Sequence, residues 1–113
     1  MYVRTARFEG GRIEDILAEL NDIQADIESL NLGESSERLP KELSDHLRRM
    51  ETFVDRRRGS VELLLYCDSE SDALEIDRIM SGVSPQRPGW GTRVWADVYE
   101  VLIDEPIGRT RAA

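Results

Sequence analysis

Two segments of this chain, residues 61–67 and 93–103, carry apolar side chains at both odd and even positions. Side chains alternate between the two faces of a strand, so a strand with one face in water should alternate between apolar and polar residues. These segments therefore predict a sheet that is covered on both faces. A chain of 113 residues has material for two helices, which can cover one face. We expect a second copy of the chain to cover the other.

The composition is typical of one globular domain. The 12.9 kDa chain is 40% apolar and 34% charged, and we expect residues 1–106 to form a single domain and residues 107–113 a flexible tail. The formal net charge of -8 argues against a nucleic-acid partner, because phosphate binding depends on clustered Lys and Arg. The one basic run, residues 56–58, lies between Asp55 and Gly59 and is typical of a solvated hairpin turn rather than an anion contact.

We expect neither a membrane span nor a secretion signal. No segment approaches the ~20 apolar residues of a membrane span, and residues 1–5 lack the apolar core of a signal peptide. Cys67 is the single cysteine, which excludes an intramolecular disulfide, and its apolar neighbours predict a buried thiol that acts as a small hydrophobe. We expect a cytoplasmic protein with no metal, no cofactor, and neither membrane nor nucleic acid as a partner.

The order of the expected elements indicates the fold class. We predict strands over 2–8, 48–55, 61–67 and 92–103, a long helix over 13–30 closed by Gly33, a short helical piece over 39–47, a loop over 83–91, and a second main helix over 73–80 preceded by capping residues. In this order each βαβ unit crosses over right-handed, so both main helices reach the same face. The prediction is an α+β, ferredoxin-like βαββαβ fold with a four-stranded antiparallel sheet and helices on one face.

The same segments resemble a known superfamily. The hairpin over 53–66, the helix start over 69–74, the closing segment 97–101 and the first strand over 2–10 are similar to those of the dimeric α/β-barrel superfamily, in particular to antibiotic biosynthesis monooxygenase-like domains. The resemblance implies that two copies pair their sheets into a barrel. Members include cofactor-independent monooxygenases acting on polyketide quinols, haem-degrading enzymes, and small proteins of no established activity.

The resemblance transfers few site residues. The haem-degrading branch requires an Asn on the first strand, a Trp on the third and a His on the second main helix. This chain has no such Asn or His, and Tyr66 stands about where the Trp would be. In the monooxygenase branch, aromatic and polar residues bind a phenolic substrate, and Tyr66 is the matching candidate.

The last strand supplies further candidates for a binding site. If it is regular, one face presents Arg93, Trp95, Asp97 and Tyr99, and the other presents Val94, Ala96, Val98 and Leu102 for helix packing. We expect the first set to face the dimer barrel, where Tyr66, Trp95 and Tyr99 would form an aromatic wall. Arg4 or Arg93 would then bind an acidic ligand group, and Asp97 would accept a proton. Alternatively, Arg93 and Asp97 pair with each other or across the interface.

His46 is the only histidine and therefore the default candidate for a general base. Asp45 beside it does not complete a triad, because adjacent helical residues point apart. The catalytic candidates are thus His46, Tyr66 and Asp97, and the alternative for His46 is a surface residue without chemistry. We expect Trp90, in its Pro-Gly-rich loop, to fill a core or a partner surface.

Two hypotheses of function follow. In the first, the protein is a homodimeric ligand-binding or structural module. In the second, it is a monooxygenase-like enzyme that acts without a cofactor on a phenolic or polyketide-like small molecule. An accessory subunit of a biosynthetic enzyme is a third. The first two differ in what they require of the barrel interior. The enzyme needs open space, whereas in the binding or structural module the interior is filled by Leu64, Tyr66, Trp95 and Tyr99.

Overall fold

Five strands form one antiparallel sheet in the computed structural model, which describes residues 1–108. The strands are β1 (Tyr2–Gly10), β2 (Arg49–Asp55), β3 (Ser60–Cys67), β4 (Gln86–Arg87) and β5 (Gly91–Glu100), in the spatial order β2-β3-β1-β5-β4. The α+β class and the antiparallel sheet are as predicted, and the order of the four long strands is compatible with a ferredoxin-like arrangement. The sheet has a fifth strand that the sequence analysis did not predict. Of the expected tail, residues 109–113 lie outside the described part of the chain.

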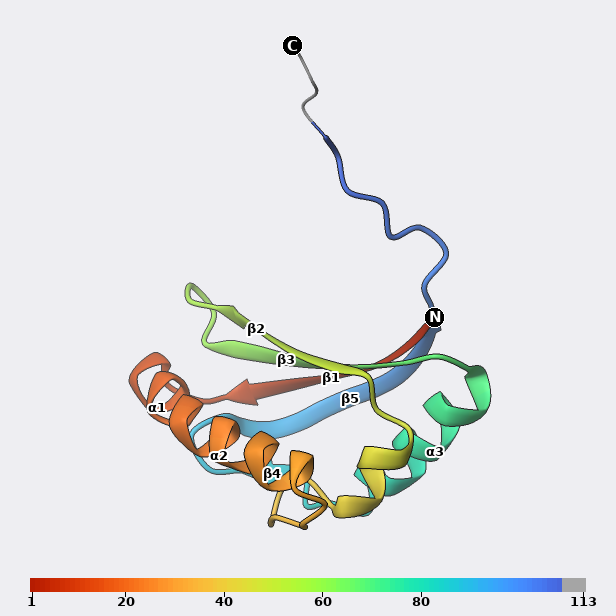
Figure 1. Ribbon diagram of the computed structural model, residues 1–113. Coiled ribbons are helices and arrows are strands. Elements are labelled where there is room, and N and C mark those ends of the chain that lie inside the picture. The colour runs from red at the N-terminus through yellow and green to blue at the C-terminus, as the bar shows by residue number, and fades with distance from the viewer. Residues whose placement is uncertain (109–113) are drawn as a thin grey trace.

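The helices all lie on the same side of the curved sheet (Figure 1). They are α1 (Ile13–Ala18), α2 (Leu20–Asn31), the short 3₁₀ helix η1 (Lys41–Asp45) and α3 (Glu70–Ser81). Within residues 1–108, no helix combines the length and the apolar character that crossing a bilayer requires. The face of the sheet opposite the helices carries no covering element from the described residues.

The helix predicted over 13–30 is divided at Glu19, which ends α1 and precedes α2. Gly89 packs against this junction so closely that a Cβ added there would lie 2.6 Å from the Glu19 Cγ and 2.8 Å from the Asp15 carbonyl oxygen. The division thus coincides with a contact from a distant part of the chain, which helical periodicity alone does not predict.

The predicted helix ends are confirmed. Gly33 adopts a φ of 76°, the left-handed conformation that follows a helix, and the Glu34 N–H donates to the Ser29 carbonyl across it. At the start of α3, the Ser69 hydroxyl accepts a hydrogen bond from the Asp72 N–H at 3.1 Å. Local sequence therefore sets both boundaries, through the backbone freedom of a glycine at one and a capping hydroxyl at the other.

The core lies between the sheet and the helices. Its sheet side includes Ala6 and Phe8 on β1 and Val61, Leu63, Leu65 and Cys67 on β3, and its helix side includes Ile16, Ile23, Leu30, Ala73, Ile76 and Met80. Cys67 is buried as predicted, and burial raises the pKa of its thiol. The hairpin between β2 and β3 also forms as predicted, with Asp55 accepting hydrogen bonds from the Arg57 and Arg58 N–H groups.

The predicted faces of the last strand are wrong at its beginning. Arg7 pairs with Trp95, but the next residue, Phe8, pairs with Arg93, so that Val94 is an extra residue in β5. This β-bulge reverses the alternation, and Arg93 lies on the helix side of the sheet whereas Trp95 lies on the other side. Val94, expected to pack on helices, is 49% exposed.

The last strand also ends earlier than predicted, at Glu100 instead of Ile103. Glu100 pairs with Tyr2, which is the first residue of β1, and the Val101 N–H donates to the Met1 carbonyl at 2.8 Å. The residues after Val101 have no neighbouring backbone among the described residues to pair with. Leu102, expected among the helix-packing residues, therefore lies beyond the sheet and is exposed.

The segment 83–91, predicted as a loop, contains the fifth strand. Residues 87–90, Arg-Pro-Gly-Trp, form a turn in which the Trp90 N–H donates to the Arg87 carbonyl and Gly89 has a φ of 81°. Pro at the second position and a left-handed Gly at the third are the signature of a type II turn. The turn sends Trp90 inward, where it is fully buried with its ring edge-on to Phe8 at 5.4 Å. Trp90 is thus a core residue.

The pairing of Gly10 with Gly91 allows a matched test of backbone strain. Gly10 and Gly91 pair across β1 and β5 with φ values of 94° and 93°, but only at Gly91 would a Cβ meet backbone, lying 2.0 Å from the Glu9 carbonyl oxygen. We expect Gly10→Ala to lower the free energy of unfolding by about 1–2 kcal/mol from strain alone. Gly91→Ala should lower it by several kcal/mol more, because the backbones must separate. Urea denaturation measures both, and equal effects would contradict this packing.

Candidate functional site

A pocket of about 280 Å³ lies on the helix side of the sheet, between α2 and α3. Residues from the sheet, from both helices and from the loops before η1 and after α3 line it. They are Arg4, Phe8, Glu19, Asp22, Glu37, Arg38, Leu63, Met80, Val83, Ser84, Gln86, Arg87, Pro88 and Arg93. We call this the arginine pocket, because four of its lining residues are arginines.

Arg4 enters the pocket from the centre of the sheet and is only 1% exposed. Its Nε donates to the Asp77 carboxylate on α3 at 3.0 Å, whereas its Nη2 is buried and has no acceptor among the described residues. Burial lowers the pKa of Arg4, and the partly exposed Asp77 opposes that shift. One guanidinium edge is therefore satisfied and the other is open.

Arg38 lies on the α2 side and is fully engaged by carboxylates. Its Nη1 donates to Glu19 at 2.5 Å and its Nε donates to the buried Asp26 at 2.8 Å. Although burial opposes it, these two carboxylates raise the pKa of Arg38. Arg38 thus neutralises acids of α2, which leaves it little free charge for another partner.

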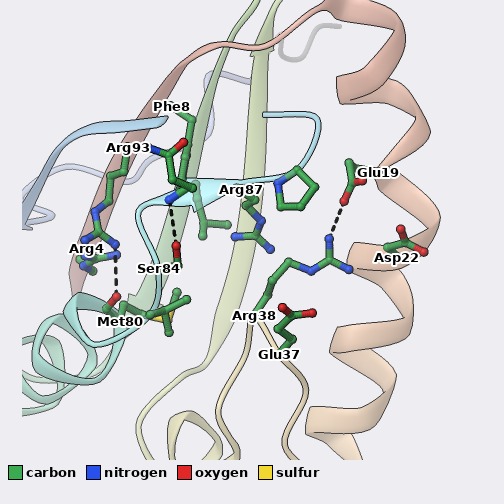
Figure 2. Close-up of a pocket in the computed structure, with 14 residues that line it drawn as sticks. Arg4, Phe8, Glu19, Asp22, Glu37, Arg38, Met80, Ser84, Arg87 and Arg93 are labelled. Carbon is green, nitrogen blue, oxygen red and sulfur yellow. Dashed lines mark hydrogen bonds and ion pairs between the residues drawn. The ribbon is translucent and has the colours of Figure 1, made fainter. Parts of the chain in front are cut away.

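Arg87 lies between these two groups, as Figure 2 shows, and it has no comparable partner. It is 6% exposed, its Nε is buried without an acceptor among the described residues, and its guanidinium carbon lies 4.3 Å from the centre of the Trp90 ring. Burial lowers its pKa to about 10, so the side chain keeps its positive charge at neutral pH. An aromatic face attracts a cation but does not neutralise its charge.

The pocket has a basic interior and an acidic mouth. Arg93 donates from Nη1 to the Met80 carbonyl at 3.2 Å, which holds it beside the pocket. Asp22 and Glu37 also line the pocket, but they are exposed to solvent. The inner walls combine guanidinium groups with apolar side chains, whereas the free carboxylates lie at the surface.

The opposite side of the sheet carries a surface of mixed character that we call the open face. Its apolar and aromatic residues are Val3 on β1, Phe53 on β2, Leu64 and Tyr66 on β3, and Trp95 and Tyr99 on β5. Thr5 and the charged residues Arg7, Arg49, Glu51, Glu62 and Asp97 lie among them. Phe53, Trp95 and Tyr99 are 52%, 40% and 49% exposed. Large aromatic side chains are thus gathered on a surface that the described residues leave in water.

Tyr66 is tied to its neighbours on the open face. Its hydroxyl donates to the Glu51 carboxylate at 2.7 Å, and the Arg49 guanidinium carbon lies 4.4 Å from its ring centre. Burial and then Glu51 raise the pKa of Tyr66, which keeps the phenol protonated at neutral pH. Asp97 lies on the same face, where its carboxylate accepts from the Val98 N–H at 3.1 Å. The two residues are separated by β1, which is two strand spacings or about 10 Å across the sheet, and they are offset by two residues along it, because Tyr66 pairs with Val3 and Asp97 with Thr5.

His46 lies elsewhere, at the end of η1 against the start of α3. Its Nδ1 is 2.7 Å from the Asp72 Oδ1, which makes Asp72, and not the adjacent Asp45, its carboxylate partner. This pair joins η1 to α3 on the helix side. The structure therefore does not bring His46 together with Tyr66 or Asp97.

The residues predicted to bind a ligand fall into two groups. Arg4 and Arg93 line the arginine pocket, whereas Tyr66, Trp95 and Tyr99 lie on the open face. The sequence analysis missed Arg38 and Arg87. For Arg87 a local signal existed, because a Pro-Gly pair predicts a turn that brings its neighbours back to the sheet.

Comparisons with known proteins identify no relative, so the function has to be inferred from the fold and the site. The sequence matches no model of a known protein family, and no curated protein is significantly similar to it. The resemblance to monooxygenase-like domains stays a prediction. Among residues 1–108, no group of three or more His, Cys, Asp or Glu side chains is arranged to hold a metal ion.

The contact of His46 with Asp72 predicts a dependence of stability on pH. The hydrogen bond from His46, followed by that from Ser69, lowers the pKa of Asp72 below its ordinary value of 3.8. A carboxyl group whose pKa is lower in the folded protein than in the unfolded chain stabilises the fold at pH values above its ordinary pKa. This contribution is lost as the pH falls through the lowered pKa. We expect Asp72→Asn to lose less stability than the wild type between pH 7 and pH 3, measured by urea midpoints. Asp45→Asn, at an exposed neighbour, should behave as the wild type, and identical losses in all three proteins would contradict the role of Asp72.

Proposed function

We propose that the protein is a homodimeric module that binds a small molecule within each protomer. The observation that carries the proposal is the division of the sheet into two unlike faces. Helices cover one face and leave a pocket beneath them, while the other face presents exposed aromatic side chains. The proposal assigns ligand binding to the first face and association of two copies to the second.

The composition of the open face favours a protein partner over solvent. Tyr and Trp are enriched at the centres of interfaces, where they contribute much of the binding energy. A second copy is the economical partner, because two copies related by a two-fold axis can bury the same surface on both sides. The resulting pair of stacked sheets is the dimeric α/β barrel expected from the sequence.

The segment that follows β5 adds to this argument. Residues 101–108 run away from the body of the protein without helix or strand (Figure 1). Leu102, Ile103 and Ile107 in this segment are almost fully exposed. These three aliphatic side chains, which follow the last strand, are available to contact the partner in such a dimer.

The arginine pocket supports binding more than catalysis. Its volume is near the low end of the range of ligand pockets, about 300–1,000 Å³, and its walls combine apolar and charged groups. The three residues considered for catalysis, His46, Tyr66 and Asp97, do not converge on this pocket or on one another. We therefore propose a binding module in place of a monooxygenase-like enzyme.

Light scattering tests the dimer. The wild type should have about twice the chain mass of 12.9 kDa at micromolar concentration. Trp95→Asp should shift the protein to the monomer mass, because it replaces a large exposed aromatic side chain of the proposed interface with a carboxylate. Leu74→Asp is the matched control: Leu74 is also exposed, at 55%, but lies on α3, and this variant should remain a dimer. A monomeric wild type, or a folded Trp95→Asp variant that is still dimeric, would refute the proposed interface.

A further inference from the structure

We infer that the ligand of the arginine pocket is a small organic anion with one negative charge and an apolar body, such as a monocarboxylate. This inference rests on the proposed binding function and names the chemical class of its ligand. It is carried by two buried guanidinium groups that line the pocket, Arg4 and Arg87, each of which has a buried nitrogen without an acceptor among the described residues.

The first step is the distribution of charge within the pocket. The carboxylates closest to the arginines are already engaged, Asp77 by Arg4 and both Glu19 and Asp26 by Arg38. Arg87 is left with the Trp90 and Phe8 rings, at 4.3 and 6.0 Å. Burying a charge costs free energy unless a partner of opposite charge compensates it. An anion beside Arg87 would supply that compensation, and the free Arg4 Nη2 would supply a second donor.

The second step is the chemistry of the remaining walls. Phe8, Leu63, Met80, Val83 and Pro88 form an apolar lining, which suits a hydrocarbon body and not a bare inorganic ion. A guanidinium group presents donors in a planar fork that matches a carboxylate. The two features together describe an organic acid that has its charged end toward Arg87 and Arg4.

The third step limits the charge of the ligand. Asp22 and Glu37 line the pocket where it meets solvent, and both are exposed. Carboxylates at the entrance repel anions, and the repulsion grows with the charge of the ligand. Attraction to the buried arginines grows with the charge as well, but of the two only Arg87 has no carboxylate in an ion pair, because Asp77 already pairs with Arg4. One negative charge on the ligand is therefore compensated inside the pocket, and a second would mainly add repulsion at the entrance. The pocket thus favours a monoanionic carboxylate over a dianionic phosphate ester.

Isothermal titration calorimetry with three probes of similar size tests the inference. The probes are benzoate, which is a monoanion; phenyl phosphate, which is largely dianionic at pH 8; and benzyl alcohol, which is neutral. At constant ionic strength in chloride buffer, benzoate should bind at least tenfold more tightly than either of the others. Equal binding of benzoate and benzyl alcohol would overturn the charge recognition but leave the binding function standing. Tighter binding of phenyl phosphate would overturn the preference for one charge, and no binding of any probe would overturn both proposals.

Variants locate the binding to the pocket. Arg87→Met keeps the apolar stem and removes the charge, and it should lose at least tenfold in affinity for benzoate. Arg78→Met is the matched control, because Arg78 on α3 is exposed and paired with Glu75, and its affinity should equal that of the wild type. Circular dichroism checks that Arg87→Met is folded. If it is not, Arg87→Lys replaces it in the test. This variant keeps the positive charge but loses the planar guanidinium fork, so it should bind benzoate more weakly than the wild type. Unchanged affinity in a folded Arg87 variant would overturn the assignment.

Discussion

The cluster of Phe8, Trp90 and Arg87 is the contact on which the architecture of this protein depends. Phe8 belongs to the central strand, and Trp90 closes the turn that joins β4 to β5. Burial of this pair supplies apolar contact at one end of the core, where the two strands and the α1–α2 junction meet. Because Arg87 lies on the same turn, the packing that closes the core also places a guanidinium inside the pocket. Core and site are thus parts of one arrangement.

The elements with local signals could be predicted from the sequence, whereas the register between strands could not. The capping side chain of Ser69, the left-handed Gly33 and the apolar period of α3 act within a few residues of one another, and they gave the helix ends correctly. The extra residue Val94 depends on how β5 meets β1, and no pattern within β5 reveals it. One unrecognised bulge was sufficient to assign Arg93 to the wrong face.

The candidate site was harder to predict for the same reason. Its arginines come from positions 4, 38, 87 and 93, and only the topology of the sheet and the crossing of the helices bring them together. The overall charge of -8 gave no hint of a basic interior, because a sum over the chain does not describe where charges lie. In this protein Asp22 and Glu37 lie at the mouth of the pocket, whereas Arg4, Arg38 and Arg87 lie inside it, held by carboxylates or by the Trp90 ring.

The bulge at Val94 gives a single strand two separate tasks. Ahead of it, Arg93 belongs to the interior under the helices, and after it, Trp95 and Tyr99 belong to the opposite surface. A regular strand would couple these positions through its alternation, so that any slip would disturb both sides together. The extra residue uncouples them. Substitutions on either side of the bulge can therefore change the interior pocket and the opposite surface independently, although the positions are close neighbours in the chain.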